Sequence, residues 1–224
     1  MTFKKFVKYV NEEENLIKTI LISLAASFAL LTFLYFFRLR YVADFIPKYG
    51  FFLFFAILSY SLILPSVKHV KRYMEFQCMS GMMIGMTIGT VSGFLSGFYI
   101  ASTNGMFVGS VFGMAVGIFL GIWNGKCCGI MGTLEGIMAG FMGGLMGAMT
   151  SFMLLNDNIK YMSVIVFVVS GTILFGLNYM IYKETRETEK RSEENDFFVI
   201  FWSVLLTTIT IWLMVFGPRS AIFQ

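Results

Sequence analysis

The sequence predicts an all-α, polytopic integral membrane protein of about seven transmembrane helices, with a glycine-zipper core formed by helices 3 to 5. Of the 224 residues, 57% are hydrophobic and only 13% are charged, against roughly 25% charged in soluble domains. The stretch 76–125 has no charged residue over 50 positions. At about 1.5 Å per residue this length exceeds one crossing of a hydrocarbon core about 30 Å thick, so the chain must turn back within it.

Glycine recurs at every fourth position in three successive apolar segments, which begin at Gly81, Gly105 and Gly132. A spacing of four places each row on one helix face, where a neighbouring helix can approach to backbone contact. Glycine costs about 1 kcal/mol relative to alanine in a helix interior, a cost that the lipid core tolerates because it enforces the helix. We expect the helix-packing contacts at Gly85, Gly89, Gly113, Gly117, Gly136 and Gly140.

Apolar length and turn residues divide the chain into four sections. A cytosolic amphipathic N-terminus (1–15), with a solubilising tail as the alternative, precedes helices 1 and 2 (16–75). The glycine- and methionine-rich helices 3 to 5 follow (76–155), and then helices 6 and 7 (156–224), with a charged cytosolic loop at 183–196. That loop is a solvated helix extension or a docking site for a cytosolic partner. The predicted spans are 16–37, 49–67, 76–101, 105–124, 127–155, 161–182 and 197–216.

Loop charges predict the orientation. With the N-terminus in the cytosol, 12 Lys and Arg residues lie on the inner side and 5 on the outer side. This bias favours a cytosolic N-terminus and an outside C-terminus. Because the positive charges lie at helix ends, the net charge of +4 indicates membrane lipids as partners, not nucleic acid. The compact chain, rich in phenylalanine and lysine, is most simply assigned to a bacterial cytoplasmic membrane.

Sulfur is concentrated in the glycine-rich section, since all three cysteines and 13 of the 17 methionines lie within 74–153. On the fifth span the methionines, together with Glu135, recur every three or four residues and share one face. Thiolates and thioethers select Cu(I) and similar soft ions, so the stripe is a candidate metal route with cysteines at its inner mouth. The alternative is packing, because flexible methionine fills gaps beside glycine. The candidate ligands are Cys78, Met82, Cys127, Cys128, Met131, Met138 and Met142.

Glu135 is the acidic residue well inside a predicted span, and it falls in the methionine stripe. An intramembrane carboxyl group is costly and is by default a functional candidate. It could bind a cation, carry a proton or donate a hydrogen bond. The alternative is a neutral group paired with Asn124, Thr133 or a serine of the third helix.

The adjacent Cys127 and Cys128 at a helix start resemble bacterial mercury-uptake membrane proteins. The methionine spacing with glycine packing is similar to that of copper-uptake channels. Each resemblance covers a few residues and would imply soft-metal movement. The number of spans differs from both families, and none is assigned.

Two functions follow from these patterns. The first is membrane transport or a channel, moving or relaying a soft metal such as Cu(I) along the fifth helix. The second is a non-transporting scaffold or assembly subunit that packs and oligomerises through its glycine faces, as a homo-oligomer or with a membrane-complex partner. The sequence has no nucleotide-binding glycine loop, HExxH motif or Ser-His-Asp arrangement, so we do not expect an enzyme.

Overall fold

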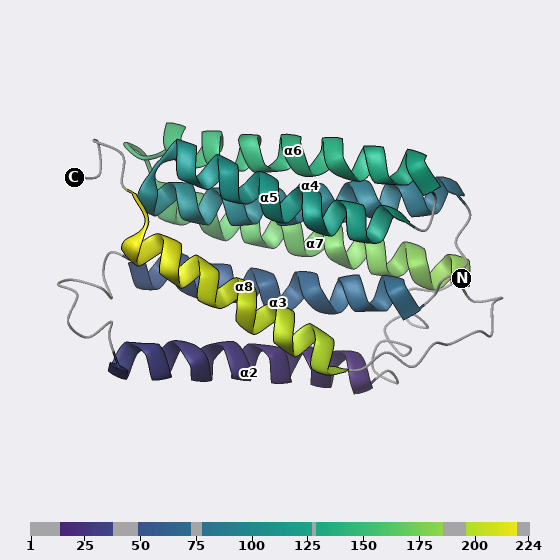
Figure 1. Ribbon diagram of the computed structural model, residues 1–224, viewed down its shortest axis with the longest axis horizontal. Helices are drawn as coiled ribbons and strands as arrows, with labels where there is room; N and C mark the ends of the chain where they lie inside the picture. Colours follow the sequence, from purple (N-terminus) through teal and green to yellow (C-terminus); the bar gives the residue numbers. More distant parts are fainter. Residues whose placement is uncertain (1–13, 38–48, 73–77, 127–128, 186–195, 219–224) are drawn as a thin grey trace.

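The computed structural model describes residues 14–37, 49–72, 78–126, 129–185 and 196–218. Within these ranges the regular structure is helical, without strands, and seven helices lie side by side (Figure 1). Each overlaps one predicted span, so the all-α prediction is confirmed for the part of the chain described. The helices are α2 (Glu14–Phe37), α3 (Phe51–Arg72), α4 (Cys78–Asn104), α5 (Met106–Gly125), α6 (Gly129–Met153), α7 (Ile159–Thr185) and α8 (Asp196–Phe216).

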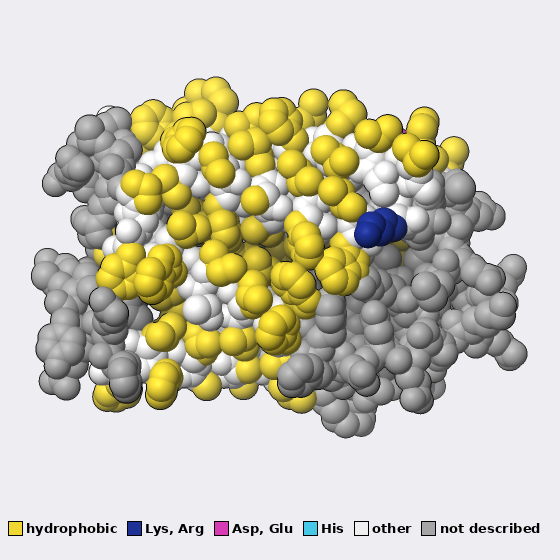
Figure 2. Space-filling view, viewed as in Figure 1, with side chains coloured by type: hydrophobic (Ala, Val, Ile, Leu, Met, Phe, Trp, Pro, Cys, Tyr) yellow, Lys and Arg dark blue, Asp and Glu magenta, His cyan; other side chains and the backbone are white. Residues whose placement is uncertain are grey.

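Four of these helices are long and apolar enough to cross a membrane: Met79–Asn104, Met106–Gly125, Gly129–Met153 and Ile159–Ile181. Shorter apolar stretches occur in α2, α3 and α8. Hydrophobic side chains cover most of the described surface on the face shown in Figure 2. Length and composition therefore indicate an integral membrane protein. The predicted N-terminal segment 1–15 and the charged loop 183–196 lie almost entirely outside the described residues.

Helices α4, α5 and α6 contact one another more extensively than any other helices in the described fold, and their glycine rows meet. A Cβ atom added at Gly93 would lie 2.9 Å from the Gly140 carbonyl oxygen and 3.2 Å from that of Gly113. One added at Gly117 would lie 2.9 Å from the Gly140 Cα and from the Gly89 carbonyl oxygen. Since real Cβ contacts are rarely so short, these helices approach to a distance that side chains would prevent. Backbone atoms of a neighbouring helix likewise stand close to Gly85 and Gly136.

The direction of the three helices follows from a tight turn and a short connection. Gly105 alone separates α4 from α5 and has φ 111°, a conformation that L side chains rarely adopt. The reversal makes α5 antiparallel to α4, and α6 runs parallel to α4 again. Asn104 ties the turn to the C-terminal part of α8, because its Nδ2 donates a hydrogen bond to the Leu213 carbonyl oxygen.

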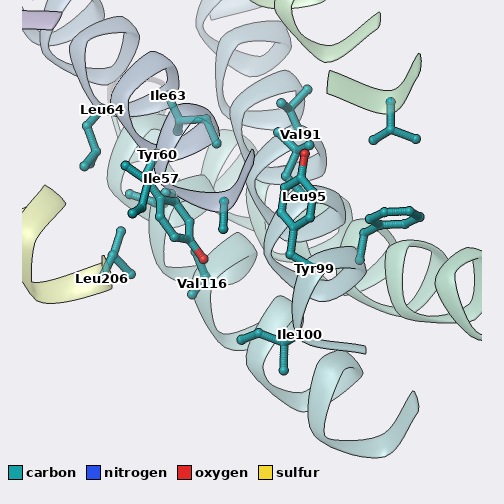
Figure 3. Close-up of a cluster of buried hydrophobic side chains, with 14 of the residues drawn as sticks. Ile57, Tyr60, Ile63, Leu64, Val91, Leu95, Tyr99, Ile100, Val116 and Leu206 are labelled. Carbon is teal, nitrogen blue, oxygen red and sulfur yellow. The ribbon is translucent and has the colours of Figure 1, made fainter. Parts of the chain in front are cut away.

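The remaining helices pack beneath this trio, with α3 in contact with α2, α4, α7 and α8. Figure 3 shows the buried cluster where α3 meets α4, with Tyr60 and Tyr99 among aliphatic side chains. Helix α2 lies farthest from the trio in Figure 1. It is joined to α8 by the Ser23 hydroxyl, which donates to Ser203 Oγ at 2.9 Å, and by a 3.0 Å hydrogen bond between Ser27 and Ser203.

Candidate functional site

Helix α6 has two unlike faces. Its glycine face is buried against both α4 and α5, whereas the opposite face is largely exposed within the described chain. Six methionines on that outward side are between 45% and 66% exposed. We call them the methionine face of α6: Met131, Met138, Met142, Met146, Met149 and Met153.

Three of the predicted metal ligands, Met131, Met138 and Met142, are therefore exposed on the outer side of α6. On α4, Met82 is partly buried while Met79, Met83 and Met86 are exposed. Cys78 begins α4, but its side chain, like residues 127–128, lies outside what the structure describes. The described residues contain no group of three or more His, Cys, Asp or Glu side chains that could hold a metal ion.

Glu135 lies in the methionine face, four residues after Met131 and three before Met138. Its side chain is partly exposed about 9 Å along the helix from the start of α6, at 1.5 Å per residue. Among the described residues it has neither a hydrogen bond nor an ion pair. Of the partners considered from the sequence, Asn124 donates to a carbonyl of its own helix at 2.8 Å and Thr133 does so at 2.7 Å. The pairing expected for a neutral, buried Glu135 is therefore not made within the described chain.

A groove runs along one edge of the methionine face, where α6 and α7 stand apart over α4. We call it the α6–α7 groove; its volume is about 470 Å³. The α4 floor and α6 wall are formed by Thr90, Val91, Phe94, Met142, Gly143 and Met146. The α7 wall is formed by Met162, Ile165, Val166, Val169, Ser170 and Ile173.

The groove lining is apolar apart from two hydroxyl groups. Thr90 donates its hydroxyl proton to carbonyl oxygens of its own helix, at 2.9 and 3.0 Å. Ser170 is 7% exposed and has no hydrogen bond to any described residue. Sequence reasoning missed this groove because its three elements are separated along the chain, and α7 carries no motif.

Comparison with protein-family models, with curated proteins and with solved structures gives no match for the chain. Function is therefore inferred from the geometry of the described residues.

Proposed function

We propose that this chain is a seven-span membrane protein that serves as a non-transporting assembly subunit. In this proposal α4, α5 and α6 form a glycine-zipper core that acts as a rigid block. The methionine face of α6 then docks against the same face of a second copy. The observation that carries the proposal is Glu135, a carboxyl group on the outward face of a candidate span without a partner in the described chain.

A carboxyl group at this place favours a protein neighbour over lipid. An ionisable side chain within a membrane span is costly and rare. Ionisable residues in spans almost always face a bundle interior or a cavity and pair with one another. A second copy related by a two-fold axis along the membrane normal would bring its own Glu135 to the same depth. The two carboxyl groups could then hydrogen-bond while at least one is protonated.

The rest of the face suits such an interface. From Met131 to Met153 it extends about 33 Å at 1.5 Å per residue, which covers a hydrocarbon core about 30 Å thick. Methionine adapts to irregular surfaces and is common at binding faces. Closed two-fold dimers are the commonest oligomers, and they require one self-complementary patch. A single continuous face on α6 meets that requirement.

The oligomeric state tests the proposal. Native mass spectrometry of the full chain released from lipid nanodiscs should show a dimer for the wild type. Met138→Trp, which adds bulk to the methionine face three residues after Glu135, should release the monomer. Val111→Trp, at a 48% exposed position of α5, should leave the dimer unchanged. A monomeric wild type, or equal behaviour of the two variants, would contradict the proposal.

A soft-metal transport route is the second candidate, because thioether groups and the Glu135 carboxyl group share one face. In this fold such a route would follow the outside of α6 and would be enclosed only by a second copy or another partner. The test is Cu(I) titration of reduced, purified protein beside a Cys127→Ser, Cys128→Ser variant. Stoichiometric Cu(I) binding by the wild type that the variant loses would support the transport route. Absence of Cu(I) binding by the wild type would exclude it.

We further propose that the protein lies in a bacterial cytoplasmic membrane with its N-terminus in the cytosol and its C-terminus outside. The assigned inner side has 12 Lys and Arg residues and the outer side has 5, and this bias supports the orientation. Single-cysteine labelling from either side of intact cells, with residues placed near each end of the chain, tests it. Labelling of the C-terminal end by a membrane-impermeant reagent is the expected result.

A further inference from the structure

We propose that the α6–α7 groove binds a single alkyl chain of a membrane lipid. This inference concerns one copy of the chain. Met142 and Met146 line the groove and also belong to the methionine face, so the bound alkyl chain would lie at the edge of the proposed interface. It rests on three properties of the groove: its length and depth, its cross-section, and the chemistry of its lining.

The α7 wall of the groove is about as long as one leaflet of a bilayer. Its α7 wall runs from Met162 to Ile173, a distance of about 16 Å at 1.5 Å per residue. Half of a hydrocarbon core about 30 Å thick is about 15 Å. The wall begins three residues inside the candidate span Ile159–Ile181 and ends just past its middle. The α7 wall therefore extends from near one membrane surface to about the midplane, as one lipid chain does. The α6 wall, from Met142 to Met146, faces about 6 Å of that length.

The cross-section of the groove excludes a whole helix. The empty space in the groove is about 990 Å³ even when the part open to the outside is counted. Over about 16 Å of length this gives a mean cross-section of about 60 Å². A helix with its side chains is about 10–12 Å in diameter, which corresponds to about 80–110 Å². A transmembrane helix from a partner could therefore rest on the rim but could not enter. A narrow, flexible hydrocarbon chain is the occupant that these dimensions fit.

The lining presents mainly carbon and sulfur to that occupant. Thr90 already bonds its own helix, so its methyl group remains for contact. The Ser170 hydroxyl can turn to the Val166 carbonyl four residues earlier, as Thr172 does to Val168 at 2.9 Å. With that hydrogen bond made, the groove offers no polar group that requires a polar ligand. Flexible methionine side chains on the α6 wall can follow the bends of an alkyl chain.

Photolabelling tests the inference directly. The full chain is reconstituted with a phospholipid that carries a diazirine in the middle of one acyl chain, irradiated and digested. We expect labels on Met142, Met146 and Val169, above the level on lipid-exposed Val111 of α5. Even labelling of all outward residues would overturn the inference.

Two variants of adjacent, equally apolar residues give the matched control. Val169→Trp fills the groove and should remove the label from Met142 and Met146. Val168→Trp adds the same bulk at a 58% exposed position that does not line the groove, and it should keep the label. If Val169→Trp does not fold, Ser170→Leu fills the same space from within. If the groove-filling variant that folds keeps the label on Met142 and Met146, the inference is overturned. Native mass spectrometry of the same samples reports the oligomeric state, so a dimer that lacks the label overturns this inference and leaves the proposed assembly standing.

Discussion

The close approach of α5 to α6 makes Gly136→Ala the most informative single substitution. A Cβ atom there would lie 2.5 Å from both the carbonyl carbon and oxygen of Gly121, whereas ordinary contact begins at 3.4 Å. The two helices must therefore separate locally by about 0.9 Å. A gap of about 0.5–1 Å loses a quarter to a half of the dispersion energy of the atoms concerned.

The magnitude follows from two opposing effects. Overpacking costs about 1–3 kcal/mol, and we expect the upper end because backbone atoms of α5 cannot move aside singly. The helix propensity of alanine offsets about 1 kcal/mol. Gly136→Ala should therefore lower the free energy of unfolding by about 2 kcal/mol. Gly171→Ala is the matched control, because nothing lies within 4 Å of a Cβ atom added there. It should raise stability by at most about 1 kcal/mol.

Both variants can be measured by unfolding in mixed detergent micelles, followed by tryptophan fluorescence. Trp123 of α5 is a suitable probe, since its ring centroid lies 5.8 Å from that of Trp202 on α8. The expected difference between the two alanine variants is about 3 kcal/mol. Equal changes in unfolding free energy at Gly136 and Gly171 would refute the backbone-contact explanation.

Three further predictions concern polar groups. Ser203→Ala removes the hydrogen bonds that join α8 to α2, including that from Ser23, and should cost about 0.6–2 kcal/mol in the same unfolding measurement; no change would show that these bonds contribute nothing. Asn104→Leu removes the donor to the Leu213 carbonyl oxygen, so amide hydrogen exchange should accelerate in the last turns of α8 and not in α6. Unchanged exchange in α8 would show that this hydrogen bond does not stabilise the end of the helix. Glu135→Gln should retain the dimer in native mass spectrometry because it can still hydrogen-bond across the interface, whereas Glu135→Lys should abolish it by placing two cations together; a dimer that survives both changes does not depend on this contact.

The sequence predicted the described helices well because each of them contains a long apolar run, and four of these runs are long and apolar enough to cross a membrane. The observed α6 (Gly129–Met153) lies within the predicted 127–155, and α5 differs from its prediction by one residue at each end. The spacing of glycines also indicated which faces would meet, since a face without side chains is useful only where another helix approaches. Periodicity of this kind is local, so it can be read from one sequence.

The direction of the methionine face could not be predicted in the same way. Regular spacing shows that Met131, Met138 and Met142 share a face, but it does not say whether that face meets a neighbour or lies outside. In a membrane the surroundings are as apolar as the core, so hydrophobicity does not separate the two cases. The groove was also beyond prediction, because Thr90, Met146 and Ser170 come together only through the packing of three separate helices.

Cross-linking in membranes tests the proposed assembly most directly. In a chain whose three cysteines are replaced by serine, Met138→Cys places one thiol in the methionine face near Glu135, and Val111→Cys provides the control on α5. A two-fold interface through α6 brings the two position-138 residues within the roughly 7 Å between Cα atoms that a disulfide allows. Mild oxidation should therefore give a covalent dimer from Met138→Cys and not from Val111→Cys. Monomer alone from both variants, or equal dimer from both, would contradict assembly through this face.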